Sequence, residues 1–269
     1  RQQGRIHRNY IIGFLISLCI ISIIIWIKWD IFTYAIIRNA SFTRQCIPSN
    51  VLLDKSPSIG IVMSYETDYY GKLGELSEQD KREYAKKHNY KIFVNNDILD
   101  STRKPSWFKV LMTKKHLKEV DWIFYVDTDT IIIDHDRPLT SFIDDRYDFI
   151  VTEDHRGINA GVWMIKNTEW SNDFLTKWYL EGEMILAKKN ITNEATFGRS
   201  GDQDTLKYLM KQGNTMDHFK ILPQCSFNSY PYMRGSWDGV YMKGDFLIHL
   251  AGKGTPNIRV LMFEAFRDG

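Results

Sequence analysis

The pentapeptide Trp122–Val126 constrains the fold more than any other segment, because it is almost wholly apolar. A strand with hardly any polar position has both faces buried, which is typical of a central strand in a parallel sheet. Further strands are predicted at 59–64, 90–94, 131–133, 149–151, 161–165 and 246–250, and helices at 78–87, 107–120, 171–181 and 202–212. Strands that alternate with helices indicate an α/β domain with a largely parallel sheet, and the polar helix at 78–87 is expected to be exposed.

The composition is that of a folded globular protein. Charged residues make up 25% of the 269 residues and hydrophobic residues 43%, and three cysteines are too few for a disulfide scaffold. The four basic residues before Asp30 meet no acidic residue there, so the remaining 31 basic residues face 33 acidic ones. The body is therefore slightly acidic, which argues against nucleic acid as a partner.

The run Tyr10–Ile27 has 18 residues without a charge, enough for a helix to span a hydrocarbon core of about 30 Å. The basic residues before it place the N-terminus in the cytoplasm by the positive-inside rule. A cleaved signal peptide is the alternative, but residues 23–29 offer no small-x-small cleavage site. We therefore predict a cytoplasmic tail at 1–9, a transmembrane anchor at 10–29, a stem at 30–57 and a lumenal body at 58–269.

Two further features agree with a lumenal body. The chain has Asn-x-Ser/Thr sequons at Asn39 and Asn190, which are acceptors for N-glycosylation. An oxidising compartment would also allow Cys46 and Cys225 to pair, although their spacing does not establish that pairing.

Two carboxylates, Asp127 and Asp129, directly follow the apolar pentapeptide. Ligands of open α/β sheets gather beyond the carboxyl ends of the strands, and neighbouring carboxylates repel each other unless a cation lies between them. Mn²⁺ or Mg²⁺, with a substrate diphosphate completing its shell, fits this pattern. A solvated turn is the alternative, but a plain turn more often carries Gly, Pro or Asn.

A phosphatase of the haloacid-dehalogenase type also carries an Asp-x-Asp motif after an apolar strand. That family has Thr or Val at the fifth position of the motif, where this chain has Ile131. Its motif also lies on the first strand of its domain, whereas this pair follows the third predicted strand. An Asp-dependent phosphatase therefore ranks below a site for a metal and a diphosphate.

Six segments carry the strongest signal when they are taken in chain order. They are Lys104–Lys109 with Asp121–Ile133, Ile158–Asn167, Trp170–Leu175, Gly201–Asp204, Leu222–Gln224 with Asn228–Pro231, and Gly244–Gly252. Together they resemble glycosyltransferase family 34, the Golgi galactosyl-, mannosyl- and xylosyltransferases. The resemblance implies a GT-A fold, Rossmann-like with a mostly parallel central sheet, in a single-pass type II protein of the Golgi or ER membrane.

The resemblance also implies a retaining transferase that uses Mn²⁺ or Mg²⁺. Asp127 and Asp129 would bind the metal, with His249 as the third protein ligand, although a histidine on such a strand is otherwise a core residue. Asp202 and Gln203 would lie beside the donor sugar, and Asp202 alone would be read as a helix N-cap. Retention requires either double displacement or a front-face route, and the sequence does not choose between them.

Contacts to the donor are implied for a further set of residues. They are Ser64, Tyr65, Lys109, Asp154, Asn159, Gly252 and Lys253. Tyr65 would stack on the base and Lys253 would reach the diphosphate as a point charge. Trp163 and Trp170 are expected in the core rather than against a sugar.

The expected donor is UDP-galactose, UDP-xylose or GDP-mannose, and the expected acceptor is a glycan. The body is short after residue 255, so acceptor loops would be reduced. A non-catalytic subunit in a complex with other glycosyltransferases is the alternative of another class, and the retained Asp127, Asp129, Asp202 and His249 argue against it.

Overall fold

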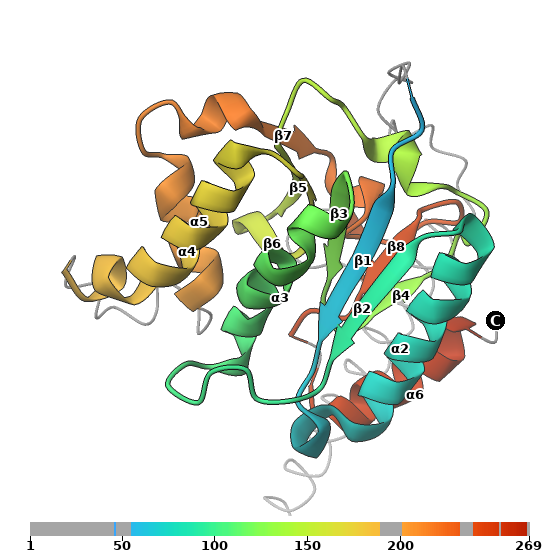
Figure 1. Ribbon diagram of the computed structural model, residues 1–269. Coiled ribbons are helices and arrows are strands. Elements are labelled where there is room, and N and C mark those ends of the chain that lie inside the picture. Colours follow the sequence, from blue (N-terminus) through green and yellow to red (C-terminus); the bar gives the residue numbers. More distant parts are fainter. Residues whose placement is uncertain (1–45, 47–54, 189–200, 232–238, 253, 268–269) are drawn as a thin grey trace, which may run out of the picture. The chain divides into compact units, whose positions relative to one another are not determined.

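A six-stranded sheet forms the centre of the computed structural model (Figure 1). Its strands lie in the order β2 (Lys91–Asn95), β1 (Ile59–Ser64), β3 (Trp122–Val126), β6 (Gly157–Lys166), β5 (Phe149–Asp154) and β7 (Phe219–Leu222). Strand β6 is antiparallel to β3 and β5, whereas the other neighbours pair in parallel. The predicted mostly parallel sheet is therefore confirmed, and β3 lies inside it with all five residues buried.

The structure describes residues 46, 55–188, 201–231, 239–252 and 254–267, all within the unit 44–269. The predicted tail, anchor and most of the stem lie outside these residues, as do both sequons and Lys253. Among the helices of the described part, none is long and apolar enough to cross a membrane.

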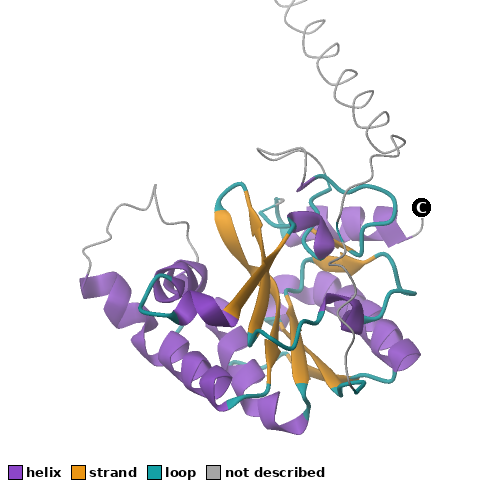
Figure 2. Cartoon of the chain, turned by 90° about the horizontal axis from the view of Figure 1, so that it is seen from above, coloured by secondary structure: helices purple, strands orange, loops and turns teal. Residues whose placement is uncertain are grey.

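Helices cover both faces of the sheet (Figures 1 and 2). One face packs against α3 (Phe108–His116), α4 (Glu169–Lys188) and α5 (Gly201–Met210) around Trp163 and Trp178. The other face packs against α2 (Thr67–His88) around Phe124 and Phe246. Short 3₁₀ helices lie at Pro105–Trp107, Leu117–Glu119, Leu139–Phe142, Thr215–His218 and Gln224–Ser226. Trp163 is a core residue as predicted, and Trp170 packs against the same core at its edge.

A second, two-stranded sheet lies beside the first. Strand β4 (Thr130–Ile132) pairs antiparallel with β8 (Leu247–His249), so that Thr130 lies opposite His249. Helix α6 (Pro256–Arg267) packs with α2 over this small sheet through the fully buried Phe263. The sequence predicts both strands but neither their pairing nor α6.

The expectation that the helix at 78–87 is exposed holds for one face of it and is wrong for the other. Helix α2 buries Asp80 and Lys81 against β4. The Lys81 ammonium lies 3.0 Å from the Asp80 carboxylate and donates to the carbonyl of Thr130, while the N–H of Ile132 donates to Asp80 over 3.1 Å. Backbone groups of β4 thus satisfy charges that a hydropathy pattern alone assigns to solvent.

Cys46 and Cys225 form a disulfide, with their Cα atoms 5.2 Å apart. The bond ties the segment before β1 to the short helix Gln224–Ser226.

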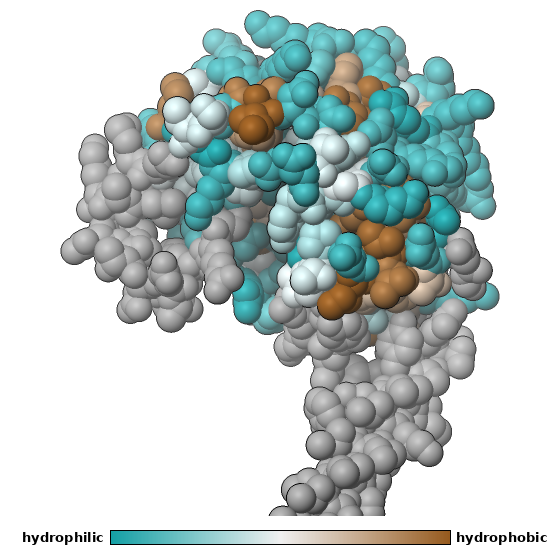
Figure 3. Space-filling model, turned by 90° about the horizontal axis from the view of Figure 1, so that it is seen from below, coloured by the Kyte–Doolittle hydropathy of each residue, from teal (hydrophilic) through white to brown (hydrophobic). Residues whose placement is uncertain are grey.

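Figure 3 views the molecule from below, the side toward which β1 runs in Figure 1. The described surface there is mostly hydrophilic, with apolar side chains gathered in separate patches.

Candidate functional site

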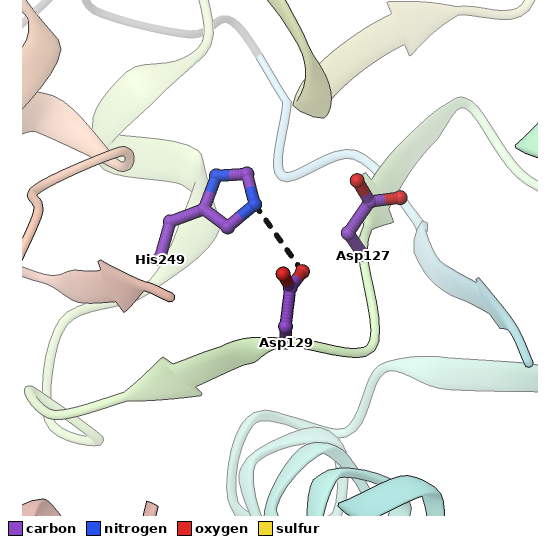
Figure 4. Close-up of side chains that lie close together, drawn as sticks. All are labelled: Asp127, Asp129 and His249. Carbon is purple, nitrogen blue, oxygen red and sulfur yellow. Dashed lines mark ion pairs between the residues drawn. The ribbon is translucent and has the colours of Figure 1, made fainter. Parts of the chain in front are cut away.

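Asp127, Asp129 and His249 converge where β3 ends (Figure 4). The two aspartates flank the turn from β3 to β4, and His249 is the last residue of β8. One ligand atom from each residue lies within 4.8 Å of the other two, and His249 Nε2 is 3.3 Å from Asp129 Oδ1. Two carboxylate oxygens and one imidazole nitrogen are a donor set that fits Mn²⁺.

Backbone hydrogen bonds fix this turn. The N–H of Asp127 donates to the carbonyl of Gly161 over 2.7 Å, and the carbonyl of Asp129 accepts from the N–H of Leu250 over 2.7 Å. The Thr128 hydroxyl donates to the carbonyl of Ser64 over 3.1 Å. The turn is therefore held by β6, β8 and β1 together, although these strands are distant in sequence.

Asn228 orients the histidine. The Asn228 Oδ1 atom lies 2.7 Å from His249 Nδ1, and an amide oxygen only accepts hydrogen bonds. Nδ1 therefore donates to Asn228, and this bond fixes the ring with Nε2 facing the aspartates, the nitrogen that would bind a metal. Asn228 was not predicted as a site residue, although it lies in one of the segments that carry the family resemblance.

Gly161 lets β6 pass directly beside the candidate metal ligands His249 and Asp127. A Cβ atom at this position would lie 2.5 Å from Cε1 of His249 and 2.7 Å from Oδ2 of Asp127. Both distances are well below van der Waals contact, so only glycine fits here without displacing a ligand. This gives the Asn-x-Gly pattern in the sequence a steric reason.

Lys109 joins two carboxylates. Its ammonium lies 3.1 Å from Asp127 Oδ1 and 3.1 Å from Asp202 Oδ2, and it donates to the carbonyl of Ala160 over 3.0 Å. Burial alone would lower the pKa of Lys109, but the two carboxylates raise it above its ordinary value. The residue predicted to contact the donor thus bridges a candidate metal ligand and the candidate catalytic carboxylate.

Asp202 and Gln203 lie in the first turn of α5. The Asp202 side chain is fully buried, and its backbone carbonyl accepts a hydrogen bond from the Trp178 indole over 2.8 Å. Gln203 Oε1 accepts from the N–H of Ala160 over 3.0 Å. Gln203 therefore contacts β6 directly, and Asp202 is linked through Lys109 to Asp127, a candidate metal ligand.

Asn159 and Asp154 form a separate polar cluster with Tyr230. Asn159 Nδ2 donates to Asp154 Oδ2 over 3.1 Å, and Asn159 Oδ1 accepts from the N–H of Gly161 over 2.8 Å. The Tyr230 hydroxyl also donates to Asp154. Burial opposes ionisation of Asp154, yet the bonds from Tyr230, Arg156 and Asn159 keep its pKa below the ordinary value.

A cavity of about 150 Å³ opens beside Asp127. It is lined by Ser64, Tyr65, Glu66, Tyr70, Pro105, Ser106, Phe108, Lys109, Tyr125, Asp127 and Thr128. Three of the residues predicted to bind the donor, Ser64, Tyr65 and Lys109, lie in this wall. Gly252 is exposed three residues beyond the end of β8 and is not part of the wall.

The Tyr65 side chain is held in place by its contacts with Gly74 and Glu78. Its ring lies so close to Gly74 that a Cβ there would be 2.4 Å from it, and its hydroxyl donates to Glu78 Oε2 over 2.9 Å. Burial and Glu78 raise the pKa of Tyr65 to about 12. Its ring therefore has a fixed place in the cavity wall.

Arg259 of α6 also reaches the site. Its Nη1 atom lies 3.1 Å from Asp129 Oδ2. Burial opposes ionisation of Asp129, but His249 and Arg259 lower its pKa to about 2. This arginine was missed, and the signal that could have found it is the helix start at Pro256 with apolar residues recurring through Phe266.

Comparison with known proteins adds the family. Residues 55–144 and 142–255 match the galactosyl transferase GMA12/MNN10 family. The chain belongs to this family. The match covers the strands, the candidate metal-ligand group and both residues predicted to be catalytic.

Two relatives illustrate how far the family likeness extends. The chain is 27% identical over 187 residues to Glycosyltransferase 6 of Arabidopsis thaliana, covering 62% of this chain and 42% of the relative. It is 23% identical over 250 residues to the probable alpha-1,6-mannosyltransferase MNN10 of Saccharomyces cerevisiae, covering 76% and 62%. The matched region thus spans about half the length of these relatives.

A solved structure of the same fold is that of a glycosyltransferase involved in glycosylation of the major capsid of PBCV-1. It superposes with a TM-score of 0.60 at 13% identity and covers 77% of this chain and 100% of that one. At this identity the likeness concerns the fold alone, and the fold is the GT-A type that the sequence resemblance implied.

Proposed function

We propose that this family member is a metal-dependent retaining glycosyltransferase that moves a hexosyl or pentosyl unit from a nucleotide-sugar to a glycan. The observation that carries the proposal is the group of Asp127, Asp129 and His249 at the edge of a cavity where β1 and β3 end. Nucleotides bind at this edge in open α/β sheets, which supports the same placement.

The charges of the site support a role for a divalent cation. Among the described residues, the carboxylates of Asp127, Asp129 and Asp202 lie beside the cations of Lys109 and Arg259. Carboxylates this close to the donor's diphosphate would repel it unless a cation lies between them. Mn²⁺ or Mg²⁺, when bound there, would stabilise the charge that develops on the leaving diphosphate.

The chain's own residues then have distinct roles in the proposal. Lys109 holds the Asp202 carboxylate next to Asp127, where the reacting end of the donor would lie. Gln203 fixes the start of α5 against β6 through Ala160. Asn159 and Asp154 offer hydrogen bonds to sugar hydroxyls, and the cavity wall with Ser64 and Tyr65 receives the nucleoside.

The first experiment measures donor hydrolysis and transfer with the full chain in detergent. We expect activity with one of UDP-galactose, UDP-xylose or GDP-mannose, dependent on Mn²⁺ and lost in Asp129→Asn. Product NMR should show the donor's anomeric configuration retained. A chain that neither binds nor cleaves any nucleotide-sugar would rule the proposal out.

Two other results would identify the alternatives. Donor binding without turnover across a broad acceptor panel would favour a non-catalytic subunit in a complex with other glycosyltransferases. Release of phosphate from a phosphomonoester would favour the phosphatase. A thermal-shift panel chooses the donor first, because a ligand at a hundredfold excess over its dissociation constant adds about 2.7 kcal/mol of stability.

The proposed location is the Golgi or ER membrane, with the anchor at 10–29 and the body in the lumen. The disulfide between Cys46 and Cys225 supports the lumenal placement, since such bonds persist in oxidising compartments. Protection of the body from protease in intact microsomes tests this topology. Cleavage of the body without detergent would contradict it.

A further inference from the structure

Each of the three candidate metal ligands has a second polar atom that is already engaged by a partner. Asp127 Oδ1 accepts from the Tyr125 hydroxyl over 2.7 Å and lies beside Lys109. His249 Nδ1 is bound to Asn228. On Asp129 the two oxygens are divided, with Oδ1 facing His249 Nε2 at 3.3 Å and Oδ2 facing Arg259 at 3.1 Å.

Arg259 is held in place by its helix. Phe263 follows it by four residues on α6, so both side chains point to the same side of the helix. Phe263 is fully buried against α2, β4 and β8, and the Arg259 side chain is only 11% exposed. The guanidinium therefore reaches Asp129 from a packed element rather than from a mobile surface position.

The division of the Asp129 oxygens matters for the kind of cation. Ca²⁺ takes six to eight oxygen ligands and often binds a carboxylate through both oxygens. Mg²⁺ requires a compact octahedral shell, and Mn²⁺ shares its preference for carboxylate and water ligands. A carboxylate that offers only one oxygen to the metal therefore favours Mg²⁺ or Mn²⁺, with the smaller coordination shell, over Ca²⁺.

We propose that Arg259 is a positioning residue that holds Oδ2 of Asp129, so that this carboxylate offers Oδ1 alone and the site selects Mn²⁺ or Mg²⁺ over Ca²⁺. The inference rests on the proposed function, because it takes Asp127, Asp129 and His249 as the metal ligands. It assigns to α6, which the sequence did not predict, control over the choice of ion.

The test measures Mn²⁺ and Ca²⁺ affinities by calorimetry on the full chain in detergent without nucleotide, for wild type, Arg259→Gln and Arg259→Lys. Loss of a positive charge strengthens binding of both ions, so the Ca²⁺ to Mn²⁺ affinity ratio isolates the effect of coordination. We expect Arg259→Gln to shift this ratio toward Ca²⁺ by about tenfold, the lower end of what an outer partner contributes to metal affinity. Arg259→Lys, which keeps a cation near Asp129, should restore part of the wild-type ratio.

Arg267→Gln is the matched control, because it removes the same charge from an exposed position on the same helix. Its ratio should equal that of the wild type. An unchanged ratio in a folded Arg259→Gln protein overturns the inference. A separate titration with UDP that shows weaker UDP binding beside an unchanged ratio would place Arg259 on the donor phosphates instead. Should Arg259→Gln fail to fold, Arg259→Lys carries the test. A wild-type chain that binds neither ion, whether UDP is absent or present, refutes the proposed function itself.

Discussion

At the scale of single residues, Lys109 bridges two carboxylates of the site. It lies between Asp127 and Asp202 with its side chain 6% exposed. Removing a buried cation that pairs with two carboxylates leaves buried negative charge without that cation, which destabilises the fold. We therefore expect the loss of Lys109 to affect both folding and catalysis.

We expect Lys109→Met to destabilise the fold by about 3–5 kcal/mol, the usual consequence of removing one partner of a buried ion pair. Adding Asp202→Asn should recover part of this stability, because it removes one of the two carboxylates that Lys109 balances. Neither variant should transfer sugar. Urea unfolding and donor turnover measure the two effects.

Lys115→Met serves as the control, since Lys115 is exposed on the same helix. It should leave both stability and turnover close to wild type. A stable and active Lys109→Met protein would show that the bridge has neither role.

At the scale of elements, α2 holds the strand that follows the turn with Asp127 and Asp129. Its buried Asp80 and Lys81 contact Ile132 and Thr130 of β4, the strand that follows Asp129. His135 also bonds to Asp80, at 3.0 Å. The position of β4, and with it that of Asp129, depends on this buried pair.

Lys81→Met should lower the free energy of unfolding by about 3–5 kcal/mol, because Asp80 loses its buried cation. The same substitution at the exposed Lys86 of α2 should change it by less than about 0.5 kcal/mol. Chemical denaturation compares the two variants. Equal free energies of unfolding for the two variants would show that the buried pair of Asp80 and Lys81 does not stabilise the fold.

Acid should weaken the attachment of the edge strand β7. Hydrogen bonds from Arg146 hold the pKa of Asp144 below its ordinary value, against burial and with help from Lys220 of β7. A lowered folded-state pKa contributes stability above the unfolded value of about 4, and this contribution is lost as pH falls through the folded pKa.

The stability difference between wild type and Asp144→Asn should thus be constant above about pH 5 and shrink as the pH falls below about 4. Unfolding curves over this range measure it. A difference that grows on acidification would contradict the assigned direction.

At the scale of the whole molecule, the disulfide joins two cysteines that lie 179 residues apart in the sequence. Chain entropy predicts about 5 kcal/mol of stabilisation for a loop of this length. The Cys46→Ser/Cys225→Ser variant should therefore unfold at clearly lower denaturant concentration, and reductant should affect the wild type alone. Cys19→Ser, in the predicted anchor, is the control and should behave as wild type.

The sequence predicted the main strands because long apolar runs mark buried strands whatever their partners. Strand β7 escaped because it is short and carries Lys220, and α6 because residues after 255 were taken as a reduced end. At the site, Asp127, Asp129 and His249 followed from motif and resemblance. Asn228 and Arg259 did not, since each acts on a partner that only tertiary structure brings near.

The pairing of β4 with β8 also sets an order in time. Asp127 and Asp129 come from the middle of the chain, whereas His249 and Arg259 follow all six strands of the central sheet in sequence. During synthesis the acidic pair is made well before its histidine and arginine. In the proposed function, binding of the ion would therefore report that a nascent chain has completed folding, rather than that its sheet has formed.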